Sequence, residues 1–346
     1  MSHGCHFFFC GVLRARFRVT VDFIVTATIA FDRNTLPLCA EFSLVGTRCL
    51  LSTNSPYVLR LSAQWQAVKS PPAAHSFQME IVEDPSLAFH APGIPHFRGQ
   101  GHLVFALLEP TSLFSFDLLR RRVAGALSPA AARDSYFWNV QLLPIAIGLL
   151  GTTMGVAPLH CACLDRNGSG LLVAGDSGAG KSTLTAALAR SGFPVVSDGW
   201  TYVSQDAGRL VAHGLFAPIK LLPDTVQFFP ELRCKTPKRT LNGELAHEVD
   251  PENVFRSTVK SSAPPKWLVF LERTSLPGCQ FVPCRPEHTI QFFERNAEKL
   301  PLGLPEAVRA RSEVIKKLSG CQSWILRTGS DPIQTARAID EFLPKE

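Results

Sequence analysis

The chain has 346 residues, of which 46% are hydrophobic and 18% are charged, a composition that predicts a globular protein with a sizeable core. The 35 basic residues exceed the 29 acidic ones by six, and they are scattered instead of forming blocks. This pattern excludes the basic tracts of nucleic-acid-binding tails. We therefore expect no nucleic-acid partner, whereas an acidic ligand such as a nucleotide is compatible with the charge.

The ten cysteines include no CxxC pair and show no metal-ligand spacing. Cys161 and Cys163 are expected to be buried thiols on one face of a strand, and a metal or redox pair is the alternative. Free thiols persist in a reducing compartment, so the sequence predicts a cytoplasmic protein.

Residues 1–34 form a leader that the sequence defines least. Three arginines precede an apolar stretch from Val19 to Phe31, which loosely resembles a signal or anchor segment. Asp22 interrupts this stretch, and it is too short to cross a bilayer. We interpret it as a strand or an irregular leader.

Residues 35–134 are predicted to form a β-rich N-terminal region, because short apolar runs alternate with polar, proline-rich turns. The runs expected to be strands are Phe42–Gly46, Tyr57–Leu61, Gln78–Val82 and His102–Leu107. Residues 135–346 are predicted to form a second, catalytic domain. It opens with an apolar helix from Ser135 to Met154, which Pro144 interrupts, so we expect a buried helix and no membrane span.

From Leu159 onward, strands and helices alternate, as is typical of an α/β fold. The expected order is a strand Leu159–Leu164, a turn at Asn167-Gly168, a strand Leu171–Ala174, a helix Lys181–Arg190 and a strand Val195–Asp198. Further strands are expected at Thr201–Ser204, Leu210–Leu222, Trp267–Glu272 and Ser323–Arg327, with helices at Glu306–Leu318 and Pro332–Leu343.

A glycine-rich loop joins the strand that ends at Ala174 to the following helix, and it has the pattern GxxxxGKS. In such loops backbone N–H groups surround phosphate oxygens, the lysine neutralises the outer phosphates and the hydroxyl binds magnesium. The helix N-terminus adds partial positive charge. We therefore expect ATP and Mg²⁺ to bind here. The predicted nucleotide-binding residues are Gly175, Asp176, Ser177, Gly178, Ala179, Gly180, Lys181, Ser182 and Thr183.

Asp198 ends the strand that follows this helix. If that strand runs parallel to the one before the loop, their carboxyl ends share one edge of the sheet, and Asp198 lies beside the phosphates. It could then orient the metal or accept a proton, the alternative being a turn aspartate before Gly199. His160, taken alone, fits a buried core histidine better than a catalytic residue.

The stretches Leu159–Cys163, Gly170–Ser182 and Gly192–Asp198 together resemble the catalytic domain of HPr kinase/phosphorylase, a P-loop kinase whose core is similar to that of phosphoenolpyruvate carboxykinase. The resemblance implies that Lys181 clamps the phosphates, that Ser182 is the metal ligand, and that Asp198 is the general base. It also makes His160 an active-site residue. The chain is most similar to the HPr-kinase-related group, to which the strand Leu268–Arg273 also corresponds.

The sequence departs from HPr kinases at Gly199, where they usually carry a second aspartate, and it has no counterpart of their Glu-x-Arg-Gly-x-Gly signature. The expected activity is transfer of the γ-phosphoryl group of ATP to a hydroxyl, serine above all, of a protein or peptide. The alternatives are a non-catalytic ATP sensor and a small-molecule or carboxykinase-like enzyme. The sequence leaves a homo-oligomer open. Lys220, Arg239 and Arg273 are further candidates for phosphate or acceptor contacts, and a surface position is the alternative for each.

Overall fold

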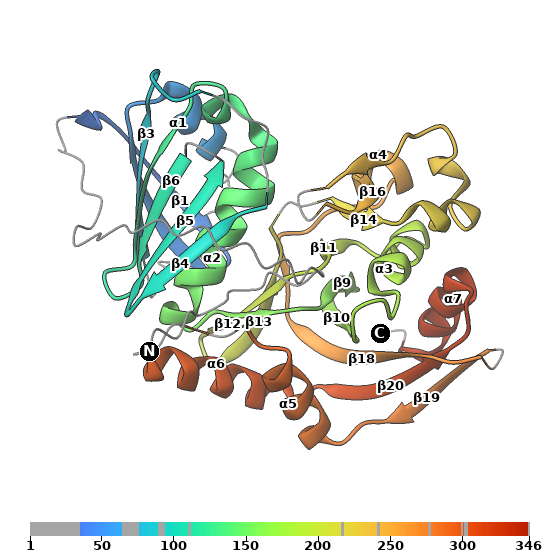
Figure 1. The fold of residues 1–346 in the computed structure, drawn as a ribbon. Coiled ribbons are helices and arrows are strands. Elements are labelled where there is room, and N and C mark those ends of the chain that lie inside the picture. Colours follow the sequence, from blue (N-terminus) through green and yellow to red (C-terminus); the bar gives the residue numbers. More distant parts are fainter. Residues whose placement is uncertain are drawn as a thin grey trace, which may run out of the picture. The chain divides into compact units, whose positions relative to one another are not determined.

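The computed structural model describes residues 35–63, 76–88, 94–109, 112–215, 218–240, 243–275, 278–298, 300 and 304–344. The predicted leader, residues 1–34, lies outside this part of the chain. The described residues form two compact units of mixed α/β structure (Figure 1). The first extends to Met154 and includes Glu298–Pro305, and the second contains Gly155–Ala297 and the chain from Glu306 onward.

The first unit is built on a seven-stranded mixed sheet with the order β1-β2-β3-β7-β6-β5-β4. Its strands are β1 (Leu38–Leu44), β2 (Thr47–Thr53), β3 (Ser76–Glu83), β4 (His96–Gln100), β5 (Leu103–Glu109), β6 (Ser112–Asp117) and β7 (Arg122–Leu127). β3 pairs in parallel with both β2 and β7, and the other neighbours are antiparallel. The predicted β-rich region is therefore a single sheet.

One predicted strand of this region is wrong. Residues Tyr57–Leu61 lie in a helix, α1 (Pro56–Ala63), because local capping overrides their apolar pattern. The Ser55 hydroxyl accepts a hydrogen bond from the Val58 N–H at 3.3 Å, and Pro56 occupies the first helical turn, where its missing N–H is not needed.

The predicted buried helix before the second unit is confirmed, with an irregular start. A π-helical turn (Phe137–Leu142) leads into α2 (Leu143–Leu150) and a 3₁₀ turn (Gly151–Met154). The whole stretch is apolar and long enough to cross a membrane by composition, but 72% of it is buried inside the protein. The amide of Gln141 donates to the Leu108 carbonyl of β5 at 3.1 Å. The stretch consequently belongs to the first unit, and the two compact units divide after Met154. The predicted domain boundary, in contrast, lay before residue 135.

The second unit holds three further sheets and five helices among its described residues. Its strands are β8 (Ala157–Leu159), β9 (Ala162–Arg166), β10 (Ser169–Ala174), β11 (Val195–Ser197), β12 (Thr201–Asp206), β13 (Arg209–His213), β14 (Ile219–Leu221), β15 (Lys238–Arg239), β16 (Leu245–Val249), β17 (Ser262–Ala263), β18 (Pro265–Arg273), β19 (Cys279–Pro283) and β20 (Gln322–Thr328). Its helices are α3 (Lys181–Arg190), α4 (Pro251–Phe255), α5 (Pro286–Arg295), α6 (Pro305–Leu318) and α7 (Pro332–Phe342).

A six-stranded sheet with the order β11-β9-β10-β18-β20-β19 forms the centre of the second unit, and helices cover both faces. Alternate residues of β10 face opposite ways: Leu171 and Val173 pack in one core with α3 and α7, while Leu172 and Ala174 pack in another with α5 and α6. Figure 1 shows α3 and α7 side by side along one side of this sheet. Because both faces are buried, β10 is a continuous apolar strand.

One predicted feature around this sheet is corrected by its topology. The expected single strand from Leu159 to Leu164 is two strands, β8 and β9, which belong to different sheets and are separated by His160 and Cys161. β11 does not pair with β10, because β9 lies between them and is antiparallel to both. β10 and β11 therefore still run in the same direction, and their carboxyl ends lie at the same edge of the sheet.

The carboxyl-terminal elements follow the predicted pattern. α6, β20 and α7 begin or end within one residue of the expected helices and strand. The Asp331 carboxylate accepts hydrogen bonds from the N–H groups of Ile333 at 2.8 Å and Gln334 at 3.2 Å, which caps α7. The apolar stripe of α7, including the fully buried Ala336 and Ile339, contributes to the core shared with α3.

Asp331→Ala removes this cap, and we expect it to lower the free energy of unfolding by about 1 kcal/mol. Glu341→Ala is the matched control, because Glu341 is exposed on the same helix and makes no cap. Urea unfolding followed by circular dichroism measures both. Equal stability of the two variants would show that the cap contributes nothing.

Candidate functional site

The loop between β10 and α3 is shaped by three glycines. Gly175, Gly178 and Gly180 have φ angles of 154°, 80° and 98°, a region that residues with a side chain rarely adopt. A Cβ atom at Gly175 would also lie 3.1 Å from the Leu271 carbonyl oxygen of the neighbouring strand β18. Glycine at these positions lets the backbone curl tightly beside the sheet and enter α3 at Lys181.

The Lys181 side chain lies inside this curl. Its ammonium group donates to the carbonyl oxygens of Gly175 at 2.9 Å and Asp176 at 3.2 Å, and the residue is only 9% exposed. The cation is thus held next to the backbone N–H groups at the start of α3, so positive charge gathers at one place. This arrangement suits an anion with several oxygens.

Asp198 follows β11 and reaches the same place. Burial raises the pKa of its carboxyl group, while hydrogen bonds with the Ser182 hydroxyl and the Lys220 backbone, the charge of Lys181 and a hydrogen bond with Thr185 act in the opposite direction. Its Oδ1 atom is buried and has no hydrogen-bond partner among the described residues. A buried carboxylate oxygen without a donor is costly unless a ligand completes it.

The chemistry of these oxygens fits a magnesium ion. The described residues contain no cluster of three or more His, Cys, Asp or Glu side chains that could hold a metal. Mg²⁺ does not require such a cluster, since it is usually bound through one or two protein oxygens, with phosphates and waters completing an octahedron. The unpartnered Oδ1 of Asp198 and the Ser182 hydroxyl would be those oxygens.

His160 lies in the break between β8 and β9, and it also approaches Lys181. Its ring centroid is 5.4 Å from that of Trp200, and the two planes are inclined by 43°. Burial, together with the charge of Lys181, lowers the pKa of His160 to about 4. The imidazole is therefore neutral at pH 7 and can accept or donate a hydrogen bond without adding charge.

Gly199 explains how the chain turns after Asp198. Its φ angle is 82°, and a Cβ atom there would meet nothing within 4 Å. There is room for a side chain, but the left-handed backbone favours glycine. The presence of glycine, and not of a second aspartate, at position 199 thus matches the left-handed conformation of the backbone there.

The three additional basic candidates have different positions. Lys220 serves the site through its backbone, which hydrogen-bonds with Asp198. The Arg239 guanidinium donates to the Gly243 carbonyl at 2.9 Å on the surface. Arg273, at the end of β18, lines a pocket beside the loop.

Sequence reasoning missed Arg295 of α5, which forms an ion pair with Asp176 at 3.2 Å, because α5 itself was not predicted.

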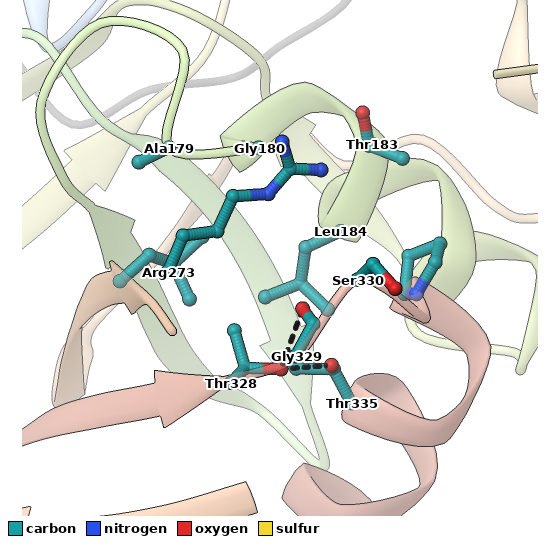
Figure 2. A pocket seen from close by; sticks show the side chains of 11 residues that line it. Ala179, Gly180, Thr183, Leu184, Arg273, Thr328, Gly329, Ser330 and Thr335 are labelled. Carbon is teal, nitrogen blue, oxygen red and sulfur yellow. Dashed lines mark hydrogen bonds between the residues drawn. The ribbon is translucent and has the colours of Figure 1, made fainter. Parts of the chain in front are cut away.

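The structure has a pocket beside the loop (Figure 2). It lies between the start of α3, the ends of β18 and β20, and the start of α7. The residues lining it are Ala179, Gly180, Thr183, Leu184, Leu271, Arg273, Thr328, Gly329, Ser330, Pro332 and Thr335. Four of these residues belong to the phosphate-binding motif or to the first turn of α3, so the pocket is continuous with the loop.

Comparison with known proteins gives a weak resemblance. No family model matches this sequence, and no curated protein matches it. A solved structure, the HPr(Ser) kinase/phosphatase from Coxiella burnetii, is similar to this chain at 12% sequence identity with a TM-score of 0.27; the match covers 53% of this chain and 88% of that one. A TM-score of this size carries no functional conclusion.

The lowered pKa of His160 predicts a pH-dependent loss of stability. Because the folded pKa of about 4 lies below the unfolded value of 6.5, the unfolded chain binds more protons between these values. Stability is fully present above pH 6.5 and falls as the pH drops toward 4. When the pH is lowered from 7 to 5, the unfolding free energy of the parent protein should fall by about 2 kcal/mol more than that of His160→Gln. Urea titrations at both pH values measure the unfolding free energies. An equal decrease in the parent and in His160→Gln would contradict this prediction.

Proposed function

We propose that this protein is an ATP-dependent kinase with a P-loop kinase core of the HPr kinase and phosphoenolpyruvate carboxykinase type, and that it transfers the γ-phosphoryl group to a hydroxyl of a protein or peptide. The observation that supports this most is the convergence of Lys181, Ser182 and Asp198, whose Oδ1 is buried, at the start of α3. Lys181 and Ser182 begin α3, Asp198 follows β11, and together they supply a cation, a metal-binding hydroxyl and a carboxylate.

The loop and Lys181 would bind the triphosphate. The Lys181 ammonium now bonds to two loop carbonyls, and phosphate oxygens would replace these neutral acceptors with charged ones, which form stronger hydrogen bonds. The Asp176 carboxylate, at the outer part of the loop, is paired with Arg295 and so adds less repulsion toward the phosphates.

Asp198 would act as the general base. The acceptor hydroxyl attacks the γ-phosphorus, the bond from that phosphorus to the β,γ-bridging oxygen breaks, ADP leaves, and the hydroxyl proton goes to Asp198. Burial raises the pKa of this carboxyl group, which strengthens it as a base. Mg²⁺, held by Asp198 and Ser182, would offset the negative charge on the phosphates. His160 remains neutral near Lys181 and would hydrogen-bond to a phosphate or to the acceptor.

The remaining features are compatible with a kinase that works in the cytoplasm, where ATP is abundant. The eight cysteines among the described residues are all free thiols. A reducing compartment preserves such thiols.

Lys181→Ala should weaken ATP binding by at least about tenfold, because the outer phosphates lose a charge-assisted hydrogen-bond donor. Lys235→Ala is the control, since Lys235 is exposed and lies outside the phosphate loop. Isothermal titration calorimetry measures both affinities. Equal affinities in the two folded variants would remove Lys181 from the site.

Asp198→Asn should reduce phosphoryl transfer by about 10²- to 10⁴-fold, because asparagine keeps the size of the side chain but cannot accept the proton. Incubation with labelled ATP and a cell extract, followed by mass spectrometry of the phosphorylated species, identifies the acceptor and gives the rate. If Asp198 serves the metal above all, Mg²⁺-ATP affinity falls together with transfer.

Asp206→Asn is the matched control, because Asp206 ends the neighbouring strand β12 and is exposed. A rate for Asp198→Asn within about threefold of the parent, less than about 1 kcal/mol, would refute its role as base. A parent protein that binds ATP and transfers phosphate to no protein, peptide or small hydroxyl compound would be a nucleotide sensor instead.

A further inference from the structure

A basic segment of the second unit takes no part in the phosphate site. Four of the seven residues from 233 to 239 are basic and exposed, and none of the seven is acidic. The basic residues are Arg233, Lys235, Lys238 and Arg239. Within the described part of the chain none of these four forms an ion pair, whereas Arg190, Arg295 and Arg327 of the same unit do. The positive charge of this segment is therefore not offset by a bound carboxylate.

The three-stranded sheet β14-β16-β15 connects this segment to Asp198. β14 and β15 are its two outer strands. The backbone of Lys220, in β14, hydrogen-bonds with the Asp198 carboxylate. On one face of the sheet, Ile219 and Leu221 pack in the core that also contains Leu184 of α3. Figure 1 shows β14 and β16 next to α3. The sheet is thus attached both to α3 and to the proposed base.

The side chains of Lys220 and Lys238 lie on the other face of this sheet. Lys220 is paired with Glu248 and Lys238 with Ala246, and paired residues of antiparallel strands share a face. Glu248 and Ala246 are two positions apart on β16, so all four side chains lie on the same face. Glu248 is the single acidic residue of the three strands. This face therefore carries two cations and one carboxylate, an excess of positive charge beside Asp198.

The spacing of the two lysines fits an extended chain that ends at Asp198. Their backbones are roughly 12 Å apart, because two strand spacings and two residues along the strand separate them. An extended peptide covers about 3.3 Å per residue. A peptide whose hydroxyl reaches Asp198 would therefore place residues about three to five positions away next to Lys238, and nearer ones next to Lys220. Carboxylates at these positions would meet cations that form no ion pair with the described residues.

We propose that the face of β14, β16 and β15 that carries Lys220 and Lys238, the basic face, docks an acidic, extended segment of the acceptor. This rests on the proposed function, since the docked chain must present a hydroxyl to Asp198. It extends that function by naming the substrate class, which is a protein or peptide with Asp or Glu about three to five positions from the phosphorylated serine. Complementary charge would speed the encounter and fix the register of the acceptor.

The experiment compares three synthetic peptides as acceptors for the full chain. Each has one central serine, and the residues about three to five positions away on both sides are glutamate, glutamine or lysine. Initial rates with labelled Mg²⁺-ATP give kcat and KM. The KM of the glutamate peptide should be about tenfold lower than that of the lysine peptide, because several weak surface ion pairs act together. It should rise when NaCl is raised from about 50 to about 300 mM, since salt screens exposed charges.

Lys238→Glu reverses a charge of the basic face outside the phosphate loop. It should raise the KM of the glutamate peptide by about tenfold and lower that of the lysine peptide, while kcat changes less than about twofold. ATP affinity, measured by calorimetry, should stay within about twofold. Lys238→Gln, with a smaller expected effect in the same direction, replaces it if the reversal prevents folding. Lys316→Glu is the matched control, because Lys316 is exposed on α6, which packs on the opposite face of the central sheet from α3.

Equal KM values for the three peptides, or a preference for lysine, would overturn acidic docking while leaving the kinase intact. The same conclusion follows if Lys238→Glu weakens ATP binding as much as it raises the KM of the glutamate peptide. It also follows if the protein phosphorylates a component of a cell extract but none of the three peptides. A parent that binds ATP and phosphorylates no acceptor of any kind would refute the proposed function itself.

Discussion

The structure of the second unit depends on the packing of α3 against the central sheet. Leu184, Ala187 and Leu188 are buried against Leu171 and Val173 of β10, so the helix axis is fixed on the strand that precedes it. This contact sets the position of the N-terminus of α3 at the carboxyl edge of the sheet. Because the helix cannot shift without exposing its apolar residues, the loop that joins it to β10 must turn within a few residues. That constraint explains the left-handed glycines and places Lys181 inside the curl.

A second consequence concerns charge. The same packing brings the cation of Lys181, the carboxylate of Asp198 and the imidazole of His160 into a partly dry environment, where each affects the others more than it would in water. Burial disfavours charge on His160 and Asp198, and Lys181 adds to the effect on the histidine while opposing it on the aspartate. The site therefore holds one neutral ring, one cation and one carboxylate whose Oδ1 has no donor among the described residues. These groups suit a ligand that carries negative charge together with a divalent ion.

Several elements show where pattern reading worked and where it failed. The helix from Lys181 to Arg190 was predicted to the residue, because a glycine loop precedes it and a serine and glycine follow. Tyr57–Leu61 failed, because an apolar run of five residues fits a strand or a helix equally well and the Ser55 cap decided between them. α5 was not predicted, and the contact of Arg295 with the loop was therefore missed too. The apolar residues of this helix, Phe292 and Phe293, are explained only by the core in which they pack with β18.

The sequence by itself determined the phosphate loop, the helix after it and the position of Asp198 at a strand end, because these depend on local spacing and on glycine conformations that few other residues adopt. Tertiary structure decided the rest. The order of the strands, with β9 between β10 and β11, is a tertiary feature that sets where Asp198 lies relative to Ser182. The pocket beside the loop likewise forms only where β18, β20 and α7 come together. These features bring together residues up to about 150 positions apart in the sequence. Side-chain packing selects one pairing of strands over another, and such long-range contacts leave no periodic pattern in the sequence from which they could be predicted.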